Sequence, residues 1–177
     1  MTYFPTIASS PALWTTLQQA LDPPGAGPIW YEGPEKFARR LTLQGYSLVR
    51  GPRPVRQVLW IRSLPGRPDE ALASLGRARD CLAPGGLILV VELAAAPGPG
   101  TGWAARLGVR LGWSHPAQRL ARWFLEARLS PVCQRWPQGM RAWLVTCARP
   151  GSQNSHVFPV ENSRGSDRMP PGPGGAS

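Results

Sequence analysis

The stretch that decides the fold runs from Pro68 to Glu92 and reads PDEALASLGRARDCLAPGGLILVVE. Apolar residues recur at helical spacing from Leu72 to Leu82, with acidic residues before them and arginines near their end, as the helix dipole favours. Pro84-Gly85-Gly86 ends this pattern. The following run, Leu87 to Val91, is apolar without a break, which is typical of a strand covered on both faces. The stretch therefore predicts a helix, a turn and a buried parallel strand.

Further helices and strands are predicted on either side of this pair. Apolar spacing and capping residues favour helices, whereas aliphatic or aromatic runs between turn residues favour strands. The helices are predicted at residues 11–21, 35–44, 103–111 and 114–124, and the strands at 29–31, 46–49, 55–61, 131–136 and 140–147. The last two strands form an antiparallel hairpin. The fold class is therefore α/β, with a doubly wound, mostly parallel sheet and a C-terminal antiparallel hairpin.

The length of 177 residues allows one domain with a core, which we place at residues 1–150. Residues 151–177 are rich in Gly, Pro, Ser and Asn, so we expect a disordered tail there. Basic residues outnumber acidic ones 20 to 10, and all but Lys36 are arginine. This excess is consistent with an acidic partner, and equally with a bias towards arginine codons.

No signal peptide or membrane-spanning segment is visible in the sequence, so we expect a soluble cytoplasmic protein without a membrane partner. The cysteines Cys81, Cys133 and Cys147 have no CxxC spacing and are expected to be buried thiols. The histidines are His115 and His156, the second in the tail, so we expect no metal site.

The turn Leu82-Ala83-Pro84-Gly85-Gly86 and the strand after it resemble the second half of class I S-adenosylmethionine (SAM)-dependent methyltransferases. In that family a turn of leucine, any residue, proline, glycine and glycine leads into the fifth strand. The strand before the helix and the closing hairpin extend the resemblance over residues 55–150. It implies a methyltransferase-like Rossmann fold, shortened at the N-terminus because six strands are predicted against the family's seven.

The cofactor half of the family pattern is degenerate. The family places a glycine-rich turn after its first strand and an acidic residue at the end of its second, for the nucleoside of SAM. Here the first turn is Glu32-Gly33-Pro34-Glu35, and the second strand ends in Arg50-Gly51. We therefore expect no bound cofactor. If the protein is active, SAM would bind at Glu32 and Gly33.

Two residues are candidates for catalysis. Glu92 is expected at the carboxyl end of the buried strand, and His115 at the start of a helix on the same side. A neutral imidazole there would accept a proton from a substrate hydroxyl. The alternatives are a solvated strand end for Glu92 and a helix-capping segment for His115.

A basic surface is predicted on the last two helices. Arginines alternate there with Trp103, Trp113 and Trp123, as on surfaces that bind nucleic acid or protein, although an ordinary amphipathic helix pair gives the same pattern. The arginines are Arg106, Arg110, Arg119, Arg122 and Arg128.

The sequence therefore favours a degenerate, non-catalytic methyltransferase-like domain that binds a protein partner or acts as a scaffold. The alternatives are an active SAM-dependent methyltransferase with an atypical cofactor loop, and a nucleic-acid-binding module that uses the basic surface. Fold alone does not choose among them.

Overall fold

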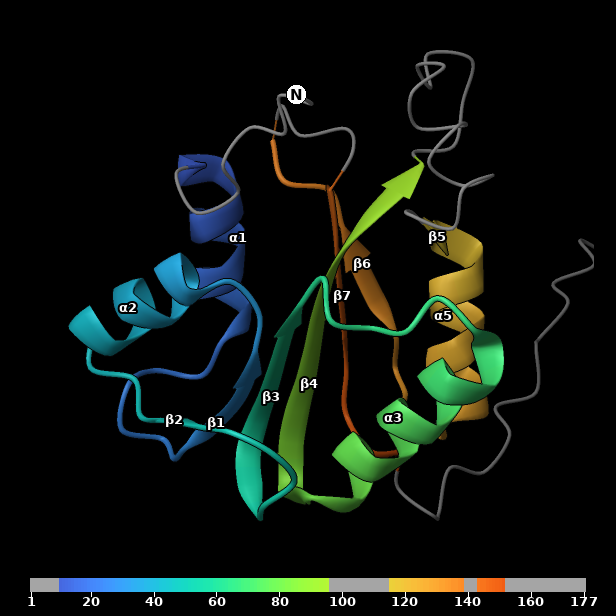
Figure 1. Ribbon diagram of the computed structural model, residues 1–177, viewed down its shortest axis with the longest axis horizontal. Helices are drawn as coiled ribbons and strands as arrows, with labels where there is room; N and C mark the ends of the chain where they lie inside the picture. Colours follow the sequence, from blue (N-terminus) through green and yellow to red (C-terminus); the bar gives the residue numbers. More distant parts are fainter. Residues whose placement is uncertain (1–9, 96–114, 139–142, 152–177) are drawn as a thin grey trace, which may run out of the picture.

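The computed structural model describes residues 10–95, 115–138 and 143–151 of the chain, and Figure 1 shows a central sheet with helices on both faces. The helices are α1 (Pro11–Ala20), α2 (Glu35–Leu43), α3 (Pro68–Asp80) and α5 (Ala117–Glu126). The strands are β1 (Ile29–Glu32), β2 (Leu48–Val49), β3 (Val55–Ile61), β4 (Leu82–Ala95), β5 (His115–Pro116), β6 (Cys133–Arg135) and β7 (Trp143–Ala148). Apart from β5, the strands lie side by side in the order β2-β1-β3-β4-β7-β6.

The sheet is mixed in direction. Strands β2, β1, β3 and β4 are parallel, whereas β7 pairs antiparallel with β4 and β6 antiparallel with β7. The short strand β5 pairs parallel with the end of β4. The predicted α/β class and the C-terminal antiparallel hairpin are therefore confirmed.

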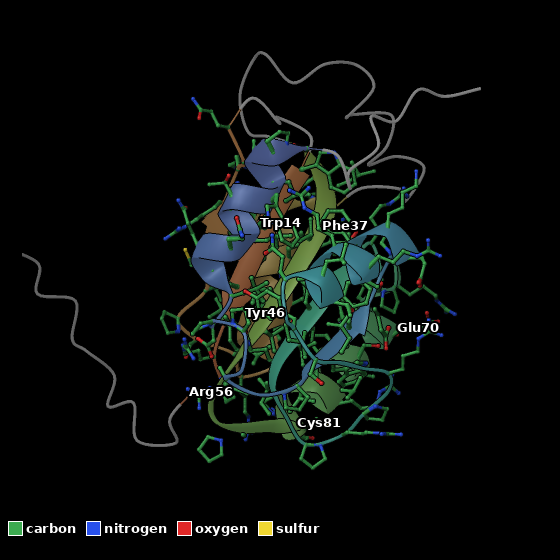
Figure 2. All side chains as sticks on the ribbon, turned by 90° about the vertical axis from the view of Figure 1, so that its left-hand side faces the viewer. Trp14, Phe37, Tyr46, Arg56, Glu70 and Cys81 are labelled. Atoms are coloured by element: carbon green, nitrogen blue, oxygen red, sulfur yellow. The ribbon has the colours of Figure 1, made fainter. Side chains whose placement is uncertain are left out.

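Each face of the sheet has its own helical layer. Helices α1 and α2 cover one face, where the rings of Trp14 and Phe37 lie 6.3 Å apart (Figure 2). Helices α3 and α5 cover the other, where Leu75 and Phe124 are fully buried against the sheet. Successive side chains of β3 and β4 point to opposite faces of the sheet and enter both cores, which is why residues 58–61 and 87–91 are apolar without a break.

Sequence signals account for the helix starts. The Ser10 hydroxyl accepts a hydrogen bond from the Leu13 N–H at 3.4 Å, and Pro11 occupies the first turn of α1. Helix α3 begins at Pro68 with Asp69 and Glu70 in its first turn, where the helix dipole favours acidic residues.

The predicted end of α3 was wrong. The helix ends at Asp80 rather than at Pro84, because the Cys81 carbonyl already accepts a hydrogen bond from the Val55 N–H at 2.9 Å. Leu82 then pairs with Val55, and an irregular stretch including Pro84 separates this pair from the regular β3–β4 ladder. The turn expected between helix and strand is thus part of β4.

The second predicted strand is shorter than expected. The prediction covered residues 46–49, but β2 contains only Leu48 and Val49. The Tyr46 side chain is instead buried in the core beside α1 and α2, and Figure 2 labels it there. Burial of Tyr46 therefore takes the place of strand pairing.

The helix predicted at 114–124 begins at Ala117, and His115 and Pro116 form β5 instead. A residue before proline is disfavoured in the helical conformation, which explains why His115 stays extended. His115 is therefore not part of a helix start. The predicted helix at 103–111 and the tail from residue 152 lie outside the described residues.

The expectation of three buried thiols was also wrong. Cys133 is exposed on the edge strand β6, whereas Cys81 and Cys147 are half-buried. In the described parts of the chain, no helix has the length and apolar character needed to cross a membrane.

Candidate functional site

A cavity of about 520 Å³ lies where β1 and β2 end and α2 begins. The carboxyl ends of parallel strands form the edge at which open α/β sheets bind ligands, and the volume is typical of small-molecule sites. Its lining residues are Tyr31, Glu32, Gly33, Glu35, Ala38, Leu48, Val49, Arg50 and Gly51. Both residues predicted from the resemblance, Glu32 and Gly33, are among them.

Gly33 is required here by packing within the protein. A Cβ atom at this position would lie 2.7 Å from the Tyr31 hydroxyl and 3.0 Å from the Cβ of Ile61. The Tyr31 hydroxyl is held in place because it donates a hydrogen bond of 2.7 Å to the Pro34 carbonyl. In a nucleotide-binding turn, glycine instead lets the backbone approach the ligand. The space beside Gly33 is already occupied by side chains of this chain.

The charges around the cavity also differ from those of a ribose site. Arg50 follows β2, and its Nη2 lies 3.8 Å from Oε2 of Glu35, the first residue of α2. A ribose diol is bound by a carboxylate at the end of the second strand, and the guanidinium here has the opposite charge. Glu35 also lies 3.5 Å from Arg39, so its carboxylate has two cations beside it.

A second cavity, of about 300 Å³, lies on the α3 side of the same edge. Its lining residues are Trp30, Glu32, Pro52, Trp60, Ser63, Ser74 and Arg77. The Trp30 indole donates a hydrogen bond of 3.0 Å to Glu32 Oε1, and its ring meets that of Trp60 edge-on at 5.3 Å. Glu32 therefore borders both cavities, and one of its carboxylate oxygens is bound within the protein.

Glu92 is buried, with 5% of its surface exposed, which excludes a solvated strand end. Its Oε1 accepts a hydrogen bond of 3.0 Å from the Leu64 N–H in the loop after β3. Arg62 has a positive φ of 55° and turns this loop back towards β4. Burial raises the pKa of Glu92 to about 7, although the Leu64 N–H and Arg62 act in the opposite direction. A carboxyl group that titrates near neutral pH is suited to proton transfer. This one accepts a hydrogen bond from the Leu64 N–H and so anchors the loop after β3.

The two candidate catalytic residues approach each other along β4. Ala94 pairs with His115, two residues beyond Glu92 on the same strand. Glu32, by contrast, is separated from Glu92 by strand β3, because β1 and β4 both pair with β3. Two strand spacings correspond to roughly 10 Å. The structure thus brings Glu92 and His115 to one strand end and leaves Glu32 at the cavities.

Part of the predicted basic surface can be located. The residues Arg119, Arg122 and Arg128 on and after α5 are exposed, and Arg122 forms an ion pair of 2.6 Å with Glu126. Arg106 and Arg110 lie outside the described residues. Within the described ranges, no three metal-binding side chains come together.

The sequence reasoning missed the second cavity, although one signal was available. Ser74 is a polar residue on the apolar stripe of α3 formed by Ala71, Leu75 and Ala78, and it is buried with them. Its hydroxyl accepts a hydrogen bond of 3.1 Å from Arg77. A serine at such a position indicates a polar environment inside the helix–sheet interface.

Solved methyltransferase structures are similar to this fold. Human N-acetylserotonin methyltransferase in complex with SAM matches with a TM-score of 0.60 and 14% identity, over 78% of this chain and 51% of that one. PigF with SAH gives a TM-score of 0.52 and 19% identity over 80% of this chain and 54% of that one. The methyltransferase SibL, in its apo form, gives 0.53 and 17% over 70% and 43%.

The chain thus spans about half the length of these structures. No protein-family model matches the sequence, and no curated protein matches it either.

The described residues do not fit the nucleoside of SAM in the way that the resemblance implies. Gly33 packs on side chains, Pro34 has no N–H to donate, and Arg50 stands where a carboxylate is needed. The sheet order and the structural likenesses nevertheless agree. The chain has the α/β fold of the class I SAM-dependent methyltransferases.

Proposed function

We propose that this chain is a methyltransferase-like domain without methyl-transfer activity, which serves as a protein-interaction or scaffold module. The observation that carries the proposal is the packing of Gly33. A Cβ atom at this position would lie so close to Tyr31 and Ile61 that the glycine has a structural purpose without any ligand. The backbone cradle that a nucleoside needs is therefore used for packing.

The ion pair between Arg50 and Glu35 supports the same conclusion. It joins the end of β2 to the start of α2 beside the cavity, with 94% of the Arg50 side chain exposed. A ribose entering there would meet a guanidinium where it needs a hydrogen-bond acceptor with negative charge.

The proposed protein contact is placed at the β2 edge. Within the described residues β2 pairs only with β1, so its other edge has no neighbouring strand, and the nearby Leu43 at the end of α2 is 87% exposed. An exposed leucine beside an open strand edge favours contact with another protein. We expect Leu43→Asp to reduce cross-linking to a partner, and Leu125→Asp, on α5, to leave it unchanged.

A second candidate function is methyl transfer with an atypical cofactor loop. It is favoured by the size and place of the cavity of about 520 Å³, which is open at the ligand-binding edge of the sheet. Under this alternative, Glu32 and Gly33 contact the cofactor, and Glu92 or His115 serves the substrate.

Calorimetric titration of the full chain with SAM and with SAH separates the two functions. We expect no saturable binding tighter than a Kd of about 1 mM. One-to-one binding in the micromolar range would overturn the proposal and favour the second candidate.

Two variants with the same change in charge test whether the charge of Arg50 or the shape of the turn at Gly33 and Pro34 prevents SAM from binding. Arg50→Asp places a carboxylate at the end of β2, and Arg39→Asp makes the same charge change at the other partner of Glu35. We expect neither variant to bind SAM, because Gly33 and Pro34 are unchanged. Binding by Arg50→Asp alone would show that charge, and not shape, blocks the site.

A further inference from the structure

Two cysteines face each other across the last pair of strands. Cys133 on β6 is the direct register partner of Cys147 on β7. In an antiparallel pair, directly opposite residues point to the same side of the sheet. Both cysteines lie in the predicted hairpin, but the pairing register decides which residues are opposite each other, and the sequence alone does not give that register.

The spacing of such a pair suits a disulfide. Opposite residues in antiparallel strands have Cα atoms about 4.5 to 5.5 Å apart, and disulfides join Cα atoms about 4.4 to 6.8 Å apart. The backbone therefore needs little movement for the two sulfur atoms to bond. Burial raises the pKa of the Cys147 thiol, and the Cys133 side chain raises it further, as expected of close neighbours.

The two thiols differ in accessibility. Cys133 is exposed, and Cys147 is half-buried against the core beneath α1. Burial, followed by the neighbouring Cys133 thiol, raises the pKa of Cys147 to about 11, although Arg135 and Arg149 act in the opposite direction. Cys147 is thus a neutral thiol at neutral pH, and a reagent meets Cys133 first.

The third cysteine does not belong to this pair. Cys81 follows α3 and packs against the core on the α3 and α5 side, whereas Cys147 packs against the core on the opposite face of the sheet. Figure 2 labels Cys81 at the end of α3. The sheet therefore separates Cys81 from the other two thiols.

We propose that Cys133 and Cys147 form a dithiol modification site that is oxidised to an intramolecular disulfide by a small anionic disulfide such as oxidised glutathione. The exposed arginines Arg135 and Arg149 lie beside the pair and attract such a reagent. The product links the edge strand β6 covalently to β7. The disulfide and the chain from Cys133 to Cys147 then form a closed covalent loop.

The reaction consists of two exchange steps. The Cys133 thiolate attacks one sulfur of oxidised glutathione, so that the glutathione S–S bond breaks, a mixed disulfide forms and one glutathione leaves as its thiolate. Cys147 gives its proton to solvent and attacks the Cys133 sulfur, which forms the Cys133–Cys147 bond and releases the second glutathione. Two protein thiols are oxidised, and one small disulfide is reduced to two thiols.

The test is a thiol count on the full chain after incubation with oxidised glutathione. We expect the number of reactive thiols to fall from three to one, with Cys81 remaining free. Because Arg135 and Arg141 lie between the two cysteines, trypsin separates their peptides unless a disulfide joins them. Mass spectrometry of the digest should therefore show a peptide pair linked through Cys133 and Cys147.

Serine variants supply the controls. Cys81→Ser should keep the intramolecular link, whereas Cys147→Ser should stop at a stable glutathione adduct on Cys133. The link should also raise the thermal midpoint by about 5 to 10 °C, a shift that Cys133→Ser abolishes. Persistent adducts on both cysteines of the unaltered chain, links between two chains, or a link to Cys81 would overturn the proposal.

Discussion

The two halves of the parallel sheet differ in how strongly the fold depends on them. Strands β3 and β4 have 7 and 14 residues and are covered by helices on both faces, whereas β1 and β2 have 4 and 2. The well-packed half carries the turn and strand that resemble methyltransferases. The short half carries the ligand edge, where Gly33, Pro34 and Arg50 differ from the family pattern. Under the proposed function, fold and ligand site change independently because they rest on different strands.

The largest effect that separates the halves is expected from core leucines. Leu89→Ala on β4 removes a fully buried side chain and should lower the free energy of unfolding by about 2–5 kcal/mol. Leu48→Ala on β2 removes the same atoms from a half-buried position on the same face, so the loss should stay under about 1.5 kcal/mol. Denaturant unfolding of both variants measures the difference, and equal losses would contradict the comparison.

The second-largest effect on stability is expected from the titration of Glu92. Its pKa is raised from 4.5 to about 7 in the folded protein, so the folded state holds the proton more tightly than the unfolded chain does. The stabilisation is complete below about pH 4.5 and is lost as the pH rises to about 7. Glu92→Gln should keep an acceptor for the Leu64 N–H without titrating. Its stability should exceed that of the unaltered protein at pH 8, by an amount on the order of 3 kcal/mol.

The measurement is a series of unfolding curves between pH 4 and pH 8, with Glu32→Gln as the control at a half-buried carboxyl group. The difference between Glu92→Gln and the unaltered protein should grow with pH and level off above pH 7. A constant difference across the series would show that folding does not raise the pKa of Glu92.

A glycine from each half gives the smallest effect. Gly33→Ala, at the end of β1, places a Cβ against Tyr31 and Ile61 and should cost about 1–3 kcal/mol. Gly76→Ala, inside α3, has open space around the new Cβ and should stabilise the protein by about 0.5–1 kcal/mol, because alanine favours helix. Thermal unfolding of the two variants measures both changes in stability. A neutral Gly33→Ala would mean that the turn has room for a ligand.

The sequence predicted the well-packed half better than the ligand edge. The apolar run Leu87–Val91 and the charges around α3 are local signals, and the structure confirms the helix–strand pair that they indicate. The short strand β2 was predicted too long because burial of Tyr46 depends on α1, which is distant in sequence. Propensity does not report such a contact.

The candidate residues show the same limit. Glu92 was predicted at the carboxyl end of a strand, but β4 continues past it to Ala95. Its burial depends on the loop at Leu64, which no pattern at Glu92 reveals. The pairing of Cys133 with Cys147 depends on hairpin register, which the turn between the strands determines. His115 was misassigned although Pro116 follows it, and that signal was present in the sequence.

The most direct test of the proposed loss of the cofactor site is a crystal structure of the full chain grown with an excess of SAH. We expect the cavity between Gly33 and Gly51 to contain no nucleoside, with Arg50 still paired to Glu35 and the Tyr31 hydroxyl still bound to the Pro34 carbonyl. A nucleoside seated against Glu32-Gly33-Pro34-Glu35, with its ribose at the end of β2, would contradict the loss of the cofactor site.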